Sequence, residues 1–501
     1  MPVVSVAHDP SVTYPPHDRH APAIAYPERP FADETLGENR AYDLVRQCLI
    51  GAGADSGAFG TASWNPLKGW IDRGSPVFIL PNLVVERRPS EPLADFQGKC
   101  TDGAVLRAVA DYAILAAGDA SLVGFGNASL QSCDYAQVAG QTGMADVGRF
   151  YRERTGRDLG PRDLRAVVTR WQHGALLDRR EQNLDDIVNV DLGSDSLLDE
   201  FYTDGYAPEF RVSDYDHRDI SDYHGPGRHV YAVHRSLLDA RTIISVPKLK
   251  THEKVGITCA VKGTVGAIAR KECLAHHRKG GSEHRGDEYP HATFIRDLAS
   301  SVADRVSILG MGVGANAIRV AGKGLYRLLR SGRQGIMAGA WHGNDTAWRM
   351  AVDIARILRF AGPDGRMSDT PQRRHVAFID GVVGGESEGP VYPRGHRAGV
   401  VLFGSDPVWA DHAAALLMKF DPNRIPIIAR SSQPMRYPIT DATAESVRVA
   451  CNGAGSDLES LTAVLDRGFD PPKGWSGWIE RPPQRLQGME RTPAAPVGPA
   501  A

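Results

Sequence analysis

The chain has 501 residues, of which 42% are hydrophobic and 24% charged, and its formal net charge is -2. It therefore contains enough apolar side chains for a buried core and falls in the ordinary globular class. The near-neutral balance argues against a protein built mainly to coat nucleic acid or an anionic membrane, because such a surface needs a large excess of Lys and Arg.

Two further features bear on the compartment. The sequence has no basic segment followed by a long apolar stretch, and no run of about 18 apolar residues. Its six cysteines show no CxxC or other clustered spacing, which predicts reduced thiols rather than a zinc ribbon or a cysteine-ligated iron–sulfur cluster. We therefore expect a cytoplasmic protein that contacts no membrane; the sequence does not indicate its oligomeric state.

Helix-like and strand-like segments alternate along the chain. Residues 1–40 are rich in Pro, His and charge and are predicted to form an irregular arm. Apolar periodicity and N-cap residues predict helices at 38–53, 101–118, 345–360 and 408–420. Short runs rich in β-branched residues predict buried strands at 77–80, 120–127, 240–248, 305–312, 375–382 and 398–406.

This alternation predicts an α/β fold in which a largely parallel sheet is covered by helices on both faces. We expect an α/β domain over residues 41–485, arranged in two lobes, with 270–345 as an inserted loop and helical region. Residues 486–501 are rich in Pro and Ala and are predicted to be disordered. Ligands of such sheets bind at the carboxyl ends of the strands, so the functional cleft is expected there.

The segment PKLKTHEKVGITCAVKG, residues 247–263, concentrates positive charge directly after a predicted strand. If the extended geometry continues, Lys248 and Lys250 lie on the same side of the chain. His252 follows them and titrates near neutral pH. Lys262 lies among glycines and apolar residues, so we expect its pKa to be lowered by desolvation unless an acidic group pairs with it.

Carboxylates gather in two later segments. Asp380 and Glu386 lie in a glycine-rich stretch that suits a divalent cation, acid/base chemistry or sugar hydroxyls, although a solvated turn explains it equally well. Asp406 precedes a proline at a helix start, where capping alone would explain it. Asp411 lies on an otherwise apolar helix and needs a partner or a ligand there.

Several other patterns have ordinary explanations. Ser387 in GESEG lacks the helix that an esterase nucleophile needs after it, and the glycines of LGMGVGAN (309–316) do not match a dinucleotide fingerprint. A histidine-rich loop suits a metal, a substrate-covering loop or plain solvation, and it contains His276, His277, His284 and His291. A basic helical face is either solvated or a docking face for an anion, and it contains Arg319, Lys323, Arg327 and Arg330.

Four blocks together resemble the family known as domain of unknown function 362. They are PVFILPNLV (76–84), SVPKLKTHEKVGITCAVKGTVGAI (245–268), IDGVVGGESEGPVYP (379–393) and AGVVLFGSDPVWADHAAALLMKFDP (398–422). Leu80 stands where the family usually has a lysine. Some members carry a ferredoxin-like module, but this chain lacks its cysteines, so no iron–sulfur cluster is expected. The family has no established activity.

The segment 247–268 is also similar, over a shorter stretch, to the pattern of the nickel-pincer lactate racemase family. On that resemblance His252 is an acid/base and Lys262 carries a cofactor or the substrate.

These observations lead to one main hypothesis, an enzyme that acts on a small anionic or polyhydroxylated molecule by proton transfer assisted by Lys and His, with isomerase, racemase or transferase chemistry. The expected catalytic residues are His252, Lys262 and Asp411. The expected substrate-binding residues are Asn82, Lys248, Lys250, His342, Asn344 and Glu386. Asp380 and Asp406 are the metal-ligand candidates, for a divalent cation as one option; the cofactor is otherwise unknown.

Two alternatives stay open. The first is a protein that binds an anionic glycan or partner without turnover, and the second is a nucleotide-dependent transferase. Neither requires nucleic acid as a partner.

Overall fold

The computed structural model describes residues 1–172, 175–203, 205–212, 216–309, 313–331 and 336–481. The predicted disordered tail, 486–501, lies outside these residues.

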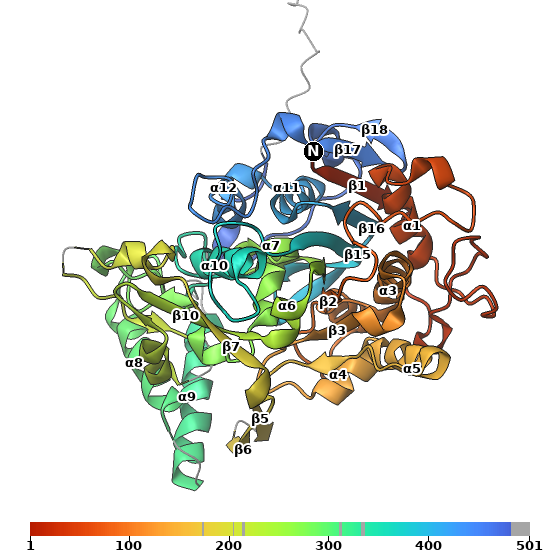
Figure 1. Ribbon diagram of the computed structural model, residues 1–501. Helices are drawn as coiled ribbons and strands as arrows, with labels where there is room; N and C mark the ends of the chain where they lie inside the picture. Colours follow the sequence, from red (N-terminus) through yellow and green to blue (C-terminus); the bar gives the residue numbers. More distant parts are fainter. Residues whose placement is uncertain (173–174, 204, 213–215, 310–312, 332–335, 482–501) are drawn as a thin grey trace, which may run out of the picture.

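A central sheet of 11 strands runs through the molecule (Figure 1). Its strands are β1 (Val3–His8), β2 (Val77–Pro81), β3 (Val123–Asn127), β4 (Arg162–Asp163), β11 (Thr242–Val246), β12 (Lys248–His252), β13 (Gly256–Ile257), β15 (Arg374–Glu388), β16 (Tyr392–Gly404), β17 (Arg448–Cys451) and β18 (Ala454–Ser456). Their order is β18-β17-β1-β16-β15-β11-β2-β3-β4, with β12 paired to β15 and β13 to β12.

The sheet is mostly parallel, as the sequence predicts. Parallel pairs join β15 to β11, β11 to β2, β2 to β3 and β3 to β4, and β12 to β15. β15 and β16 are antiparallel, because only three residues separate them and a parallel crossover needs a dozen or more. The carboxyl ends of β2, β3 and β11 therefore meet at one edge of the sheet.

Helices cover both faces of the sheet, which confirms the predicted α/β class. Side chains alternate between the faces of a strand. Val376 and Phe378 of β15 accordingly join the core under α1 (Ala41–Ala52) and α3 (Gly103–Ala117). Ala377 and Ile379 join the core on the other face, under α10 (Ala347–Phe360) and α11 (Pro407–Leu417).

Two local predictions are wrong. The arm 1–40 is not irregular throughout, since β1 lies between β16 and β17 in the sheet. Val3 belongs to the core on one face of the sheet, and Val4 and Val6 belong to the core on the other face. The strand is short and lies in a Pro-rich and His-rich segment, so its alternation is difficult to recognise in the sequence. The predicted strand 305–312 begins instead in the last turn of α8 (Phe294–Ser307), and its residues 310–312 are outside the described part. A short apolar run does not by itself distinguish a strand from a helix.

The remaining elements surround the sheet. They are α2 (Leu93–Gln97), α4 (Tyr135–Gln141), α5 (Met144–Thr155), α6 (Arg235–Asp239), α7 (Cys259–Gly263), α9 (Val313–Ser331), α12 (Pro426–Ala429), β5 (Val167–Gln172), β6 (Ala175–Glu181), β7 (Ile187–Asp191), β8 (Phe210–Arg211), β9 (His224–Gly225), β10 (Arg228–His234) and β14 (His277–Arg278). No helix among the described residues combines the length and the apolar character needed to cross a bilayer.

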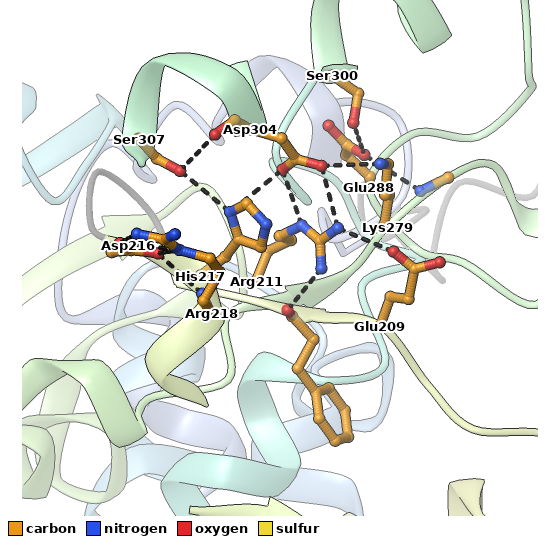
Figure 2. A network of polar contacts seen from close by, with 12 residues as sticks. Glu209, Arg211, Asp216, His217, Arg218, Lys279, Glu288, Ser300, Asp304 and Ser307 are labelled. Carbon is orange, nitrogen blue, oxygen red and sulfur yellow. Dashed lines mark hydrogen bonds and ion pairs between the residues drawn. The ribbon is translucent and has the colours of Figure 1, made fainter. Parts of the chain in front are cut away.

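A polar network ties α8 to the small sheet of β8 and β14 (Figure 2). Asp304 of α8 accepts hydrogen bonds from Arg211 Nε at 2.8 Å and from Lys279 Nζ at 2.7 Å, and His217 donates to or accepts from Ser307 at 3.0 Å. Glu288 accepts a further bond from Ser300 of the same helix. This charge pairing attaches the helical region, which includes α8 and α9, to the rest of the fold.

Candidate functional site

The carboxyl ends of β2 and β11 are joined by one threonine. The Thr101 hydroxyl donates to Val246 O at 2.5 Å and accepts from Asn82 N at 2.9 Å. The backbone oxygen of Asn82 accepts from Thr101 N at 2.9 Å. Asn82 is thereby fixed at the edge where ligands of parallel sheets bind.

Asp411 positions the short helix α7 that carries Lys262. Its two carboxyl oxygens accept hydrogen bonds from Ala260 N and Val261 N, the latter at 2.9 Å. These N–H groups lie in the first turn of α7, where the helix has no acceptor of its own. Burial raises the pKa of Asp411 to about 8, although both hydrogen bonds favour the ionised form. The partner expected for this buried carboxylate is thus a helix N-terminus, and Asp411 acts as a positioning residue.

Lys262 is a buried lysine without a hydrogen-bond partner. Its side chain belongs to a residue that is only 8% exposed, and no described residue accepts a hydrogen bond from its ammonium. Burial, followed by the neighbouring charge of Lys254, lowers the pKa of Lys262 to about 8. The pKa shift has the direction that the glycine-rich and apolar sequence around this residue predicts.

Three more lysines lie close to Lys262, and together the four form what we call the lysine cluster: Lys250, Lys254, Lys262 and Lys271. Lys250 Nζ donates to Lys99 O at 2.6 Å, Lys271 Nζ donates to Ala128 O at 2.7 Å, and Lys254 Nζ donates to Ala338 O. These acceptors are backbone carbonyls. Within the described residues, Lys250, Lys262 and Lys271 form no ion pair with a carboxylate.

The pKa values reflect this lack of counter-ions. Burial lowers the pKa of Lys250 to about 7, and the charges of Lys248, Lys99 and Lys262 contribute to the shift. Burial also lowers the pKa of Lys271 to about 7, followed by the charge of Lys262. The ammonium groups of Lys250, Lys262 and Lys271 are therefore poised to lose a proton near neutral pH or to be stabilised by a bound anion.

Two histidines border the lysine cluster in complementary tautomers. Lys254 N donates to His252 Nδ1 at 3.1 Å, so the proton of the neutral ring is on Nε2. His276 Nδ1 lies 2.9 Å from Leu274 O, a carbonyl that only accepts, so Nδ1 carries the proton and Nε2 a lone pair. Burial, and then the nearby lysine charges, lower both pKa values well below the usual range. Neutral His252 is thus a donor at Nε2, and neutral His276 an acceptor.

Unpaired polar atoms line the same edge of the sheet. Asn82 Oδ1 and Asn127 Oδ1 are buried, and no described residue makes a hydrogen bond with them. The buried Ser129 hydroxyl is a hydrogen-bond partner of the Cys133 thiol. Asn127 ends β3, and its Nδ2 donates to Pro81 O at 2.7 Å. Gly266 allows this arrangement, because a Cβ there would lie 2.1 Å from Asn127 Nδ2. Buried polar atoms normally find a partner, so the two asparagine oxygens favour a ligand or ordered water at this edge.

Lys248 and Asp380 lie apart from this arrangement and pair with each other. Lys248 Nζ is 2.6 Å from Asp380 Oδ2, and both side chains are fully buried. The Tyr14 hydroxyl donates to Asp380 Oδ1 at 2.5 Å and accepts from Lys248 Nζ at 2.8 Å, and Asp102 N donates to Asp380 Oδ2 at 3.0 Å. Lys248 and Lys250 do lie near the same segment, 99–102, as their alternation along the strand predicts. Both side chains are buried there rather than exposed in a cleft.

Glu386 is enclosed by positive charge. It accepts hydrogen bonds from Arg394 Nε at 2.9 Å, Arg467 Nη2 at 3.0 Å and His396 Nδ1 at 3.0 Å. Burial alone would raise the pKa of Glu386, but these bonds and one from Asp470 N hold it well below its usual range. The structure thus surrounds this expected substrate-binding residue with protein partners.

The two expected metal ligands do not come together. Asp380 is occupied by Lys248, whereas Asp406 caps α11 by accepting from Val408 N at 2.9 Å and Trp409 N at 3.2 Å. No group of three or more His, Cys, Asp or Glu side chains in the described part of the chain is arranged to hold a metal ion.

His342 and Asn344 also have local partners. The His342 ring stacks on Trp478, with centroids 4.4 Å apart. Asn344 Oδ1 accepts from Ala347 N at 2.9 Å at the start of α10, and its Nδ2 donates to His276 O at 2.9 Å. Asn344 therefore holds the backbone of a histidine that borders the lysine cluster.

The other patterns noted in the sequence have structural settings. Ser387 lies within β15, so no nucleophile elbow forms. Arg319 is buried over the Trp171 ring rather than on an exposed basic face, while the side chains of Lys323, Arg327 and Arg330 lie outside the described residues. His291 is exposed and contacts Glu283, and His277 is buried in β14.

Sequence reasoning assigned no role to several residues of this site. Asn127 and Ser129 follow a predicted strand, so the rule that ligands bind at strand ends would have found them. Lys271 and His276 were visible only as parts of a charged loop, because their position beside Lys262 depends on how that loop folds back.

Comparison with known proteins gives a family and no function. The model of the family described as Domain of unknown function (DUF362) matches residues 197–416. This segment, less than half of the chain, is therefore similar to the DUF362 family. The DUF362 segment includes Lys250, Lys262, Lys271 and both bordering histidines, whereas Asn82, Asn127 and Ser129 come from the part before it. No curated protein and no solved structure matches the chain.

Proposed function

We propose that this protein is an enzyme that binds a small anionic or polyhydroxylated molecule at the lysine cluster and transfers a proton on it. The observation that carries the proposal is a set of buried lysines at the carboxyl edge of the sheet, three of which have no carboxylate partner among the described residues. A buried cation without a counter-ion is unfavourable, and an anionic ligand would offset that penalty.

Proton transfer is the chemistry that these groups suit. Catalytic acids and bases work best when their pKa lies near the working pH. Burial lowers the pKa of Lys262 to about 8 and that of Lys250 to about 7. His252 offers an Nε2 proton and His276 an Nε2 lone pair, so the site contains a donor and an acceptor in their neutral states. The proposal assigns no step to a metal, because no ligand set for one is brought together in the described part.

The binding partner in this proposal is a small molecule rather than nucleic acid. A cytoplasmic location, expected from the unclustered cysteines, is also part of the proposal.

Hydrogen exchange at carbon tests the proposal without knowledge of the natural substrate. The purified protein is incubated in D2O with lactate, pyruvate and a hexose phosphate in turn. Proton NMR follows deuterium at the carbon next to the carboxylate of lactate, and at the carbon next to the carbonyl group of the other two probes. We expect incorporation into at least one of these probes, and its loss in His252→Ala and in Lys262→Ala. Lys68→Ala is the matched control, because Lys68 is exposed and pairs with Asp55 on the surface.

The result separates the proposal from its main alternative. If His252→Ala and Lys262→Ala exchange as fast as the wild type while remaining folded, the enzymatic proposal fails. Anion binding that weakens steeply with salt, without any exchange, would instead favour a protein that binds without turnover. For a nucleotide-dependent transferase, no described residue supplies support.

A further inference from the structure

Lys262 differs from the other members of the lysine cluster in its hydrogen bonding. Lys250, Lys254 and Lys271 each donate to a backbone carbonyl, which fixes the direction of the amine. No described residue accepts from Lys262, and its residue keeps 8% of its surface exposed. The amine of Lys262 is thus held at the end of α7 with its hydrogen-bonding capacity unused.

The surroundings of Lys262 favour a neutral amine. A lysine becomes a nucleophile when it loses its proton, and desolvation beside other cations is one way that proteins achieve this. Burial, followed by the charge of Lys254, lowers the pKa of Lys262 to about 8. A measurable fraction of this amine is therefore unprotonated near neutral pH.

The same edge offers groups that would bind an anionic carbonyl compound. Lys271 and Lys250 supply positive charge, and Lys262 is among the charges that lower the pKa of each of them. Asn127 Oδ1 is buried and has no partner among the described residues, and Asn127 is 1% exposed. Ala128, the next residue, accepts the hydrogen bond from Lys271, so this oxygen adjoins the cluster.

We propose that Lys262 attacks the carbonyl carbon of an oxo acid or another small carbonyl compound with an anionic group, and holds it as an iminium. This inference rests on the proposed function, and it names the substrate class and the covalent intermediate of the same site.

The atoms of this step balance without an oxidant or a reductant. The lone pair of neutral Lys262 Nζ forms the N–C bond, and the C=O π pair moves to the oxygen, which takes up a proton. Nζ loses one of its own protons to give a neutral carbinolamine. Protonation of the hydroxyl group and loss of water then leave the iminium, so that one amine, one carbonyl and one proton give one iminium and one water.

The histidines supply the proton movements. His252 donates a hydrogen bond from Nε2 to the carbonyl oxygen and stabilises the negative charge that develops there. His276 accepts at Nε2 the proton that leaves Lys262 and passes it to that oxygen, and the second proton, which the departing water needs, comes from solvent. An iminium withdraws electrons from the adjacent carbon, so a proton there becomes easier to remove. This links the covalent step to the proton transfer proposed above.

Reductive trapping tests the inference on the full chain. The protein is treated with pyruvate, oxoglutarate or dihydroxyacetone phosphate in the presence of sodium cyanoborohydride, and the product is analysed by intact mass and peptide mapping. We expect one reduced adduct per chain, located on Lys262, with at least one probe. Lactate is the control probe, since it carries the anion but no carbonyl.

A matched variant keeps the positive charge and removes the nucleophile. Lys262→Arg should lose the adduct completely, because a guanidinium stays protonated and is not a nucleophile. Its positive charge still attracts the anionic probe, so the probe should raise the melting temperature of this variant as it does that of the wild type. Lys68→Arg, on the surface, should keep both. A melting curve and a circular dichroism spectrum establish that each variant is folded.

The outcomes distinguish this inference from the proposed function. An adduct on Lys262 alone supports the inference. Probes that stabilise the wild type and Lys262→Arg but leave no adduct overturn the covalent step and leave the anion site standing. Adducts of equal yield in Lys262→Arg, spread over surface lysines, also overturn the covalent step. If none of the probes is trapped, none stabilises the protein and none exchanges hydrogen with D2O, both the inference and the proposed function are wrong.

Discussion

Two buried lysines, two residues apart on β12, have opposite environments. Lys248 meets Asp380 at 2.6 Å, and Tyr14 completes the contact from the N-terminal part of the chain. Lys250 Nζ donates a hydrogen bond to the carbonyl of Lys99 and has no carboxylate partner among the described residues. The neighbouring Lys262 has no hydrogen-bond partner among these residues. One strand thus carries a satisfied charge and leads into a set of unsatisfied ones.

The difference separates a buried charge that is neutralised within the protein from buried charges that are not. Burying a charge is costly unless it is paired and hydrogen-bonded. Lys248 and Asp380 satisfy this condition within the protein, so their pairing needs no ligand to explain it. The lysine cluster does not, and perturbed pKa values of this kind gather at functional sites more often than elsewhere. Lys248 therefore has a structural role, and Lys262 is the lysine for which we propose a chemical one.

The largest effect is expected from breaking the pair. Asp380→Asn leaves Lys248 buried without its counter-ion, and removal of one partner of a buried ion pair costs about 3–5 kcal/mol. The free energy of unfolding, measured by urea denaturation, should fall by this amount. The double variant Lys248→Met/Asp380→Leu should recover most of the loss, because it removes both charges together. An Asp380→Asn protein as stable as the wild type would break the comparison.

The sequence predicts the strands that carry the site better than it predicts which charged side chains pair with each other. The strands 77–80, 120–127 and 240–248 are recognisable because strands buried on both faces read as continuous apolar runs. The lowered pKa of Lys262 is predictable from its glycine and apolar neighbours. Both signals are local in the sequence.

Partners far apart in the sequence could not be predicted in this way. Lys248 is separated from Asp380 by 132 positions and from Tyr14 by 234. Lys248 and Lys250, on the same strand, therefore look alike in the sequence, and only the folded sheet shows that Lys248 is neutralised. Asp380 was interpreted as a metal ligand for the same reason, since a carboxylate at a strand end suits a cation and a lysine equally well.

A second effect, of opposite sign, is expected at Lys262. Lys262→Met removes a desolvated charge that has no partner among the described residues. Because the pKa of Lys262 is about 8 in the folded protein against an ordinary 10.5, the variant should be more stable than the wild type near neutral pH by about 3 kcal/mol. Lys68→Met, at an exposed site, should leave stability unchanged.

The gain must depend on pH in a defined way. The pKa of Lys262 is about 8 in the folded protein and 10.5 in its ordinary state, so between these values the unfolded chain binds more protons than the folded one. Wild-type stability from this group therefore rises with pH across that window. The advantage of Lys262→Met should be full below the folded pKa and should vanish as pH approaches the ordinary value. Urea denaturation over this range measures it; a constant advantage would show that Lys262 is not desolvated.

The smallest change in the free energy of unfolding is expected at Tyr14, which is hydrogen-bonded to both members of the ion pair. Tyr14→Phe removes one hydroxyl that donates to Asp380, accepts from Lys248 and accepts from Val383 N at 3.2 Å. The direct contact between Lys248 and Asp380 remains, so the loss should be only about 1 kcal/mol, the scale of a single hydrogen bond. If Tyr14→Phe instead destabilises the protein as much as Asp380→Asn, the hydroxyl is as necessary as the carboxylate. Lys248 would then be satisfied by a three-membered network, and the contrast with Lys262 would rest on hydrogen bonding as much as on charge.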